Sequence, residues 1–210
     1  GPALERFLDA SGALYLDTQE SRGLVRADHP AVVGAVRANA MSEADLVLVI
    51  GRKLDYQLGY GSPAVFPHAR FLRLADNAGE LLDNRRGDPE LLATPALALD
   101  AIVAAAGNRA PAVDRDWTGG LRRKHEERSR PRGPAESRGS DGKVHPAAIF
   151  EALAAVADPD FIAIADGGDL LSFARVGLQA KTYMDAGAFG CLGISVPYAL
   201  AAALALPARQ

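Results

Sequence analysis

The chain has 210 residues, 49% of them hydrophobic, and this is enough to bury the cores of one or two α/β domains. Its formal net charge of −3 gives no reason to expect a nucleic acid or a membrane surface as a partner. The single cysteine, Cys191, excludes an internal disulfide framework, and the apolar runs are shorter than the roughly 18–20 residues that cross a bilayer. With no signal-peptide pattern at its start, the sequence predicts a soluble cytoplasmic protein.

The first half of the sequence alternates between helical spacing and short apolar runs. The clearest run lies at 45–50, where β-branched residues and leucines follow one another until Gly51, as is typical of a strand buried on both faces. Strands that alternate with helices favour a parallel sheet with right-handed crossovers, so residues 1–108 are predicted to form an α/β domain. Helices are expected at 3–10, 30–41 (with Pro30 in the first turn) and 96–106, and strands at 13–16, 45–50 and 71–75.

Residues 109–143 have a different composition. The run at 122–128 is highly charged and is predicted to be an exposed helix, and residues 129–142 contain almost nothing apolar, which is typical of a mobile linker. The basic residues could also form a nucleic-acid patch, but Glu126 and Glu127 interrupt the positive charge, so a solvated helix is favoured. We therefore expect this stretch to separate two domains.

The α/β pattern resumes in residues 144–210. A helix is expected at 146–156, a buried strand at 161–165 and an alanine-rich helix at 191–206. One clear strand has too few neighbours for a complete sheet. Residues 144–210 are therefore predicted to be the start of an α/β domain that continues past Gln210.

The first candidate binding segment is Asp-Gly-Gly-Asp-Leu at 166–170, directly after the predicted strand. Open α/β sheets bind ligands beyond the carboxyl ends of their strands, and two glycines let backbone N–H groups approach an anion at a helix start. A simple strand-to-helix turn would have the same sequence. Asp169 would repel a diphosphate unless it caps the helix or a metal ion lies between.

The second candidate segment is Gly-Ala-Phe-Gly-Cys-Leu-Gly at 187–193, which leads into the alanine-rich helix. Three glycines at three-residue spacing allow the backbone to come close to a ligand or to another chain. The alternative is an element that only packs a loop against a helix.

Together, the segments at 143–146, 166–170 and 187–193 resemble the start of the diphosphate-binding domain of thiamine-diphosphate-dependent enzymes. The similarity is greatest to the group that contains acetolactate synthase, benzaldehyde lyase and oxalyl-CoA decarboxylase. Residues 15–25, 28–30 and 44–55 resemble the central domain of the same enzymes. The resemblance implies a Rossmann-like central domain with a parallel sheet, followed by an incomplete α/β domain that binds thiamine diphosphate.

The resemblance also implies roles for particular residues. The loop after the first strand of the family's cofactor domain contacts the diphosphate, and the Gly-x-x-Gly element holds the aminopyrimidine ring. By this match the Gly190 carbonyl accepts from the 4′-amino group, the Leu192 N–H donates to the ring, and the Leu192 side chain keeps the cofactor bent. The implied contacts of thiamine diphosphate are Gly168, Asp169, Leu170, Gly190, Cys191 and Leu192.

A second cofactor is implied for the first domain, which carries FAD or an ADP-containing nucleotide in some members of the family. The candidate nucleotide contacts are Gly51, Lys53 and Asp76, although structural roles at strand ends remain an equal alternative. The synthase usually has Gly-Ala-Arg-Phe-Asp where this chain has Gly-Arg-Lys-Leu-Asp at 51–55. The shifted arginine argues against FAD.

The function that the resemblance implies is the making or breaking of carbon–carbon bonds in small 2-oxo acids or aldehydes through an enamine intermediate. The magnesium ligands are expected after Gln210 and the glutamate that protonates the cofactor before Gly1, so the 210 residues alone are expected to be inactive. The whole protein is expected to be a homodimer or homotetramer. The alternatives are a non-catalytic module that binds FAD, ADP or coenzyme A, and a structural fragment that forms neither site.

Overall fold

The computed structural model describes residues 1–18, 21–109, 113–130, 138–178 and 180–210. These residues form two compact units. The first unit contains Gly1–Tyr15 and Val36–His125, and the second contains Leu16–Ala35 and Glu126–Gln210. Residues 16–35, which the sequence placed in the first domain, therefore pack within the second unit. None of the helices formed by the described residues has the length and apolar character needed to cross a bilayer.

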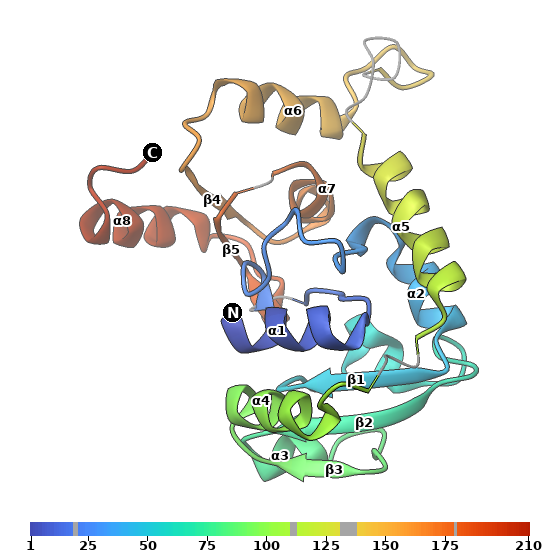
Figure 1. Cartoon of the computed structure of the whole chain (residues 1–210). Helices are drawn as coiled ribbons and strands as arrows, with labels where there is room; N and C mark the ends of the chain where they lie inside the picture. The colour runs from blue at the N-terminus through green and yellow to red at the C-terminus, as the bar shows by residue number, and fades with distance from the viewer. Residues whose placement is uncertain (19–20, 110–112, 131–137, 179) are drawn as a thin grey trace. The chain divides into compact units, whose positions relative to one another are not determined.

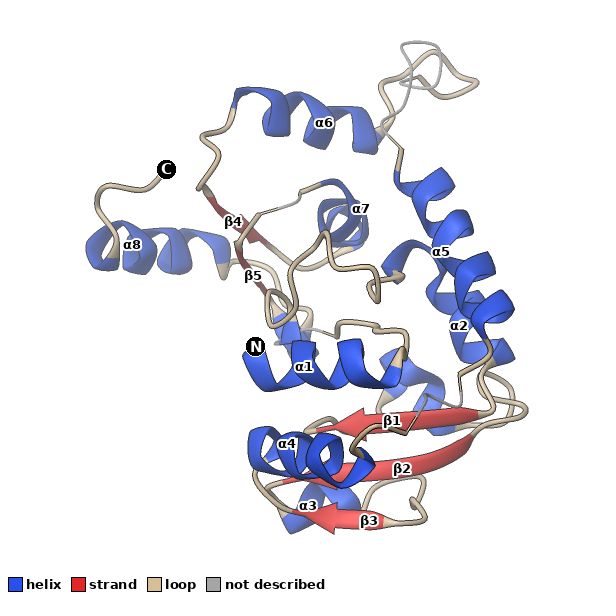
Figure 2. Ribbon diagram, viewed as in Figure 1, coloured by secondary structure: helices blue, strands red, loops and turns tan. Residues whose placement is uncertain are grey.

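The first unit is built on a parallel sheet in the order β1-β2-β3. Its strands point the same way in Figure 2, and Ile50 lies opposite Leu74 in the register of the first pair. The central strand is the most deeply buried, as expected when both faces of a sheet are covered. The predicted α/β class with a parallel sheet is confirmed. The strands are β1 (Leu46–Ile50), β2 (Arg70–Ala75) and β3 (Glu90–Leu92).

Two long helices of this unit, α1 (Pro2–Ser11) and α4 (Pro95–Ala106), pack against each other beside the sheet (Figure 1). Each has a proline in its first turn, where the missing N–H costs nothing. Arg6 of α1 donates to both carboxylate oxygens of Asp100 on α4, at 2.8 and 2.9 Å from Nη2. Helices α2 (Arg37–Glu43) and α3 (Ala78–Leu81) and a 3₁₀ turn at Tyr56–Gly61 also belong to this unit. Helix α5 (Arg115–Ser129) and the 3₁₀ turn at Gly34–Val36 each contain residues of both units.

The core of the first unit lies where β1 and β2 meet the loop that joins them. Phe66 and Phe71 pack edge to face with ring centroids 5.3 Å apart, and Leu54 is buried beside them. The Arg85 guanidinium lies 4.3 Å from the centroid of the Phe71 ring, while its Nη1 donates to the Gly61 carbonyl at 2.7 Å. These contacts fix the loop that follows β1.

The second unit contains a parallel pair of strands joined by a helix. Strand β4 (Ile162–Ala165), helix α7 (Asp169–Gly177) and strand β5 (Thr182–Asp185) follow one another, so the carboxyl ends of both strands lie at one edge. Helix α6 (Pro146–Val156) packs on α7, and α8 (Ser195–Ala205) contacts β4. A 3₁₀ turn spans Gly187–Phe189.

Several predicted elements differ from the structure. Instead of a strand at 13–16 there is a single bridge at Tyr15, and the segment at 30–41 becomes a 3₁₀ turn followed by α2, so Pro30 is outside any helix. The helix expected at 191–206 starts at Ser195, because Gly190 and Gly193 have φ values of 59° and 90°, which a helix does not allow. Within the predicted linker, Arg138 forms a bridge with Val144, and residues 131–137 are outside the described part of the chain.

Candidate functional site

The two glycine-containing segments that the sequence singled out meet in the second unit. The Gly167 N–H donates to the Cys191 carbonyl at 3.0 Å. A Cβ atom at Gly167 would overlap the Gly190 carbonyl and would lie 2.7 Å from the Cys191 oxygen. This close approach of backbone to backbone therefore requires glycine at position 167.

Asp166 fixes the far end of the second segment. It follows β4, and its two carboxylate oxygens accept from the N–H groups of Ser195 at 2.7 Å and Gly193 at 3.1 Å. These hydrogen bonds, that from Ser195 first, hold the pKa of Asp166 below its ordinary value. The carboxylate thereby satisfies N–H groups at the start of α8 and ties that helix to the end of β4.

Asp185 fixes the near end of the same segment. It is the last residue of β5, paired in register with Ala165, and its Oδ1 accepts from the Gly187 N–H at 2.8 Å. Its Oδ2 accepts from Arg175 Nε at 2.8 Å. Burial acts to raise the pKa of Asp185, but the hydrogen bonds from Arg175 and Gly187 outweigh it and the pKa is lowered.

The predicted cofactor contacts are brought together in this unit. Gly168 has a φ of 86°, and a Cβ atom there would lie 3.7 Å from Cδ2 of Leu192. Asp169 and Leu170 form the first turn of α7, and both are exposed. The N-cap of α7 is Gly168, and no side-chain cap hydrogen bond forms there in the described structure.

The loop at 187–193 exposes two large apolar side chains, Phe189 to 92% and Leu192 to 75% of their maximum. Cys191 is exposed as well. Among the described residues, no hydrogen bond uses the Leu192 N–H or the Gly190 carbonyl. These are the two backbone groups that the resemblance assigns to the pyrimidine ring. The described residues also contain no cluster of three His, Cys, Asp or Glu side chains that could hold a metal ion.

The three candidates of the first unit lie at one edge of its sheet. Gly51 follows β1 and donates to the Leu74 carbonyl at 2.7 Å, and Asp76 follows β2. Lys53 and Asp76 are exposed. Gly51 has a φ of 55°, and a Cβ atom there would meet nothing within 4 Å. Gly51 and Asp76 therefore directly follow two neighbouring strands, and nucleotide binding by these residues stays a prediction.

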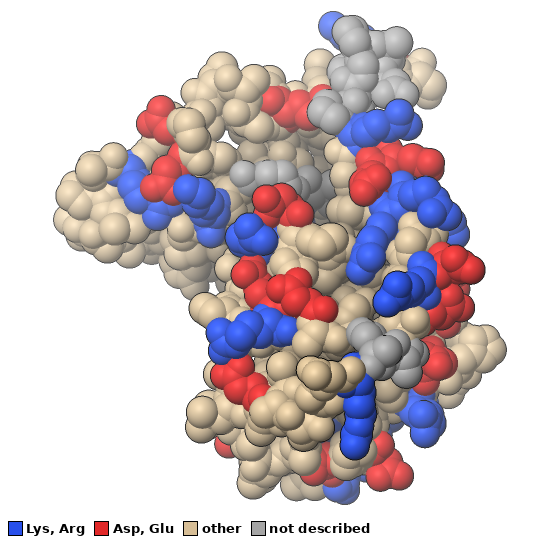
Figure 3. Space-filling model, in the orientation of Figure 1, with Lys and Arg blue, Asp and Glu red and all other residues tan. Residues whose placement is uncertain are grey.

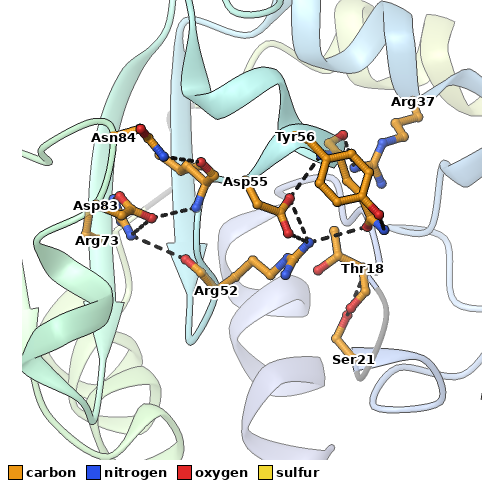
Figure 4. Close-up of polar contacts among 11 residues, drawn as sticks. Thr18, Ser21, Arg37, Arg52, Asp55, Tyr56, Arg73, Asp83 and Asn84 are labelled. Carbon is orange, nitrogen blue, oxygen red and sulfur yellow. Dashed lines mark hydrogen bonds and ion pairs between the residues drawn. The ribbon is translucent and has the colours of Figure 1, made fainter. Parts of the chain in front are cut away.

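Arg52, which the sequence placed where the family has a different residue, is used within its own loop. Its Nη2 donates to the Asp55 carboxylate at 3.0 Å and to Gln57 Oε1 at 3.4 Å. Figure 4 shows this side chain turned toward Asp55. These contacts hold one nitrogen of the guanidinium within the loop that follows β1.

Sequence reasoning missed a buried ion pair behind this edge. Arg73 of β2 has a side chain only 1% exposed, and it pairs with Asp83 and donates to the carbonyl of Glu80 (Figure 4 shows the pair). Asp83 also accepts from the Leu54 N–H at 2.6 Å. Burial acts to raise the pKa of Asp83, but the bonds from Arg73 and Leu54 lower it below its ordinary value. An arginine inside a predicted buried strand was the signal that could have indicated a pair.

A second group that sequence reasoning missed surrounds Asp185. Arg22 Nη1 donates to the Arg175 carbonyl at 3.0 Å, and the Arg22 guanidinium lies 5.1 Å from the centroid of the Tyr183 ring. Arg22 also pairs with Asp17, at 3.5 Å. Arg22 and Arg175 are 153 positions apart in the sequence, so no local pattern links them.

Charged side chains of both signs are interspersed over the face of the molecule shown in Figure 3. On this face, positive charge is not gathered into one continuous patch of the kind that binds nucleic acids.

Comparison with known proteins gives the family. Residues 1–102 match the family described as thiamine pyrophosphate enzyme, central domain. The chain is 32% identical to the acetolactate synthase large subunit of Mycobacterium tuberculosis, over 99% of this chain and 38% of that protein. It is 28% identical to 2-hydroxyacyl-CoA lyase 2 of Caenorhabditis elegans (90% of this chain, 31% of the lyase) and 23% identical to oxalyl-CoA decarboxylase of Escherichia coli (96% and 36%).

The chain therefore spans less than two fifths of the length of these relatives. The family match over residues 1–102 and the similarity that extends through residues 187–193 agree with the resemblance drawn from the motifs. Residues 1–102 therefore correspond to the central domain of the thiamine pyrophosphate enzyme family, and the chain as a whole is similar to enzymes of that family.

Proposed function

We propose that this chain is part of an enzyme that uses thiamine diphosphate to make or break carbon–carbon bonds in small 2-oxo acids or aldehydes, and that its second unit forms one wall of the cofactor site. The observation that carries the proposal is the contact between Gly167 and the Gly190–Cys191 backbone, which brings both predicted cofactor segments to the carboxyl end of β4. The similarity to a synthase, a lyase and a decarboxylase supports the reaction class.

The residues present fit the pyrimidine side of this cofactor. The Gly190 carbonyl can accept one hydrogen bond and the Leu192 N–H can donate one, and neither is used within the described residues. Gly193 has open space around the position of a Cβ atom. A backbone acceptor and a backbone donor two residues apart match a ring that carries an amino group beside a ring nitrogen.

The residues at the start of α7 fit the diphosphate group of the cofactor if a cation is bound with it. Gly168 and Leu170 offer backbone at the start of α7, where the helix dipole favours an anion. Asp166 and Asp169 bring negative charge close to this point, and a diphosphate needs a compensating ion such as Mg²⁺. We propose that the ligands of that ion come from the part of the enzyme that this chain does not contain.

Within this site the chain's own residues have positioning roles. Asp166 and Asp185 hold the two ends of the loop, and the exposed Leu192 side chain is placed beside Gly168, where it can support the bent cofactor. Thiamine diphosphate, when bound, supplies the electron sink for a carbanion. We further propose a cytoplasmic homodimer or homotetramer, with the remaining catalytic groups supplied by the rest of the enzyme.

Calorimetry with thiamine diphosphate and Mg²⁺ on the natural protein that carries this chain tests the proposal. We expect binding, and we expect Gly167→Ala to weaken it because the added Cβ displaces the Gly190 carbonyl. Gly119→Ala is the matched control, since a Cβ there makes only an ordinary contact of 3.7 Å with Arg123. No binding at millimolar cofactor contradicts the proposal that the enzyme uses thiamine diphosphate. If Gly167→Ala binds the cofactor as tightly as the unaltered protein, the second unit does not form a wall of the cofactor site.

A further inference from the structure

Strand β5 carries two polar side chains on one face. Tyr183 and Asp185 are two residues apart, so they point to the same side of the strand. Arg22 and Arg175 lie against this side: Arg22 over the Tyr183 ring and Arg175 on the Asp185 carboxylate. Residues Asp17, Arg22, Arg175, Tyr183 and Asp185 are called the β5 cluster below.

The Asp185 carboxylate is the most deeply buried charge of the β5 cluster, whereas the side chains of Asp17, Arg22 and Arg175 are between 19% and 24% exposed. The Asp185 side chain is 4% exposed, and among the described residues Nη2 of Arg175 and the hydroxyl of Tyr183 are buried without a hydrogen-bond partner. Buried ion pairs seldom stabilise a fold more than apolar side chains of similar size would. Because burying these polar atoms costs stability, we infer that they serve to fix the local geometry, a role that buried polar groups have in several proteins.

The charges of the cluster cancel, and this excludes one obvious role. Two arginines, Arg22 and Arg175, are matched by two aspartates, Asp17 and Asp185, at 3.5 and 2.8 Å. No net positive charge remains to attract an anion. The hydrogen bond from the Gly187 N–H to Asp185 Oδ1, at 2.8 Å, links the cluster to the candidate site.

Through that contact, Asp185 connects the regular backbone of β5 to the irregular backbone of the loop at 187–193. Asp185 is the last residue of strand β5. Gly187 begins the loop, in which Gly187 and Gly190 have φ values of 55° and 59°. Such backbone has few hydrogen bonds of its own to order it. Arg175 donates to the other carboxylate oxygen and so fixes the rotamer from which Asp185 accepts the Gly187 hydrogen bond.

We propose that Asp185 is a positioning residue that sets the conformation of the loop at 187–193, and that Arg175 holds Asp185 in place for this purpose. The importance of the loop rests on the proposed function, in which it holds the pyrimidine of thiamine diphosphate. The proposal itself concerns the order of the loop, and it can be tested without any cofactor.

The test is amide hydrogen exchange, measured by NMR on the 210-residue chain. We expect Asp185→Ala to speed the exchange of the amides at 187–193 about tenfold relative to those of β4, since a hydrogen bond to a charged group contributes about 1.5 kcal/mol or more. Asp185→Asn serves as a second variant that keeps an acceptor oxygen and the side-chain shape. Asp160→Asn is the matched control, because Asp160 pairs with Arg209 at 3.1 Å in the same unit but away from the loop.

A double-mutant cycle then tests the part played by Arg175. We expect Arg175→Met and Asp185→Asn together to disturb the loop less than the sum of the two single variants, since both remove the same interaction. Loop exchange that stays at the native rate, or that rises equally in β4 and in the loop for both Asp185 variants, overturns the proposal. Additive effects overturn the role of Arg175.

Cofactor binding by the natural protein separates this proposal from the proposed function. If the unaltered protein binds thiamine diphosphate, we expect Asp185→Asn to weaken binding and Asp160→Asn to leave it unchanged. If the unaltered protein does not bind the cofactor, the proposed function fails, and the exchange of the loop amides still decides whether Asp185 positions the loop.

Discussion

In the second unit, burial and neighbouring charges shift the pKa of single side chains, and Tyr183 is the clearest case. Burial disfavours its phenolate, and the nearby Asp185 charge adds to this effect, so the pKa is raised to about 12. The phenol hydroxyl is buried without a hydrogen-bond partner in the described structure. By contrast, Tyr56, Tyr60 and Tyr198 are exposed.

The raised pKa predicts how stability responds to alkali. The folded value lies above the roughly 10 of an unfolded tyrosine, so the contribution of Tyr183 is complete below about pH 10 and is lost as the pH rises toward about 12. Ultraviolet titration of the five tyrosines should show one phenol that ionises after the others, and Tyr183→Phe should remove that step. If the last step persists in Tyr183→Phe, the late phenol is a different residue.

The residues of the candidate site were only partly predictable. Gly168, Gly190 and Leu192 were named because glycine spacing after a strand is visible in a sequence, and the structure brings them together. Asp185 and Arg175 gave no such signal. Their importance arises from β5, whose sequence Thr-Tyr-Met-Asp lacks the apolar run of a buried strand.

At the scale of elements, long and strongly patterned segments were predicted well. Strand β1 and helix α6 lie where the sequence placed them, because a β-branched run and a helical apolar stripe are local properties. The short strands β3 and β5 and the late start of α8 were not predicted. These depend on partners that are distant in the sequence, such as the bonds from Ser195 and Gly193 to Asp166.

The start of α8 leads to a prediction about Gly193. Its φ of 90° lies in a region that costs an L-residue about 1–2 kcal/mol, while open space around a Cβ atom excludes a clash. Gly193→Ala should therefore destabilise the chain by about 1–2 kcal/mol through backbone strain alone. Denaturant unfolding measures this change.

A matched substitution separates strain from the general effect of adding a methyl group. Gly119 lies within α5 and makes only ordinary contacts, so Gly119→Ala should be neutral or stabilise by up to about 1 kcal/mol. Equal destabilisation by both variants would show that the backbone conformation of Gly193 is not the cause.

At the scale of the whole molecule, the family boundary and the compact units do not coincide. The central-domain match covers residues 1–102, yet residues 16–35 belong to the second unit through contacts such as Arg22 with Arg175. Composition indicates a domain limit at a polar stretch such as 129–142. It does not show which segment of the chain packs on which core.

Each unit has its own buried ion pair, and this allows the units to be perturbed separately. In the first unit, Asp83 pairs with Arg73, whose side chain is 1% exposed, and also accepts from the Leu54 N–H. Asp83→Asn leaves the Arg73 charge buried without its counter-ion, which costs about 3 kcal/mol in comparable pairs. We therefore expect faster amide exchange in β1 and β2. The exposed pair of Arg6 and Asp100 provides the control, since Asp100→Asn should cost at most about 1 kcal/mol. If Asp83→Asn changes exchange in β4 and β5 as much as in β1 and β2, the two units unfold as one cooperative body.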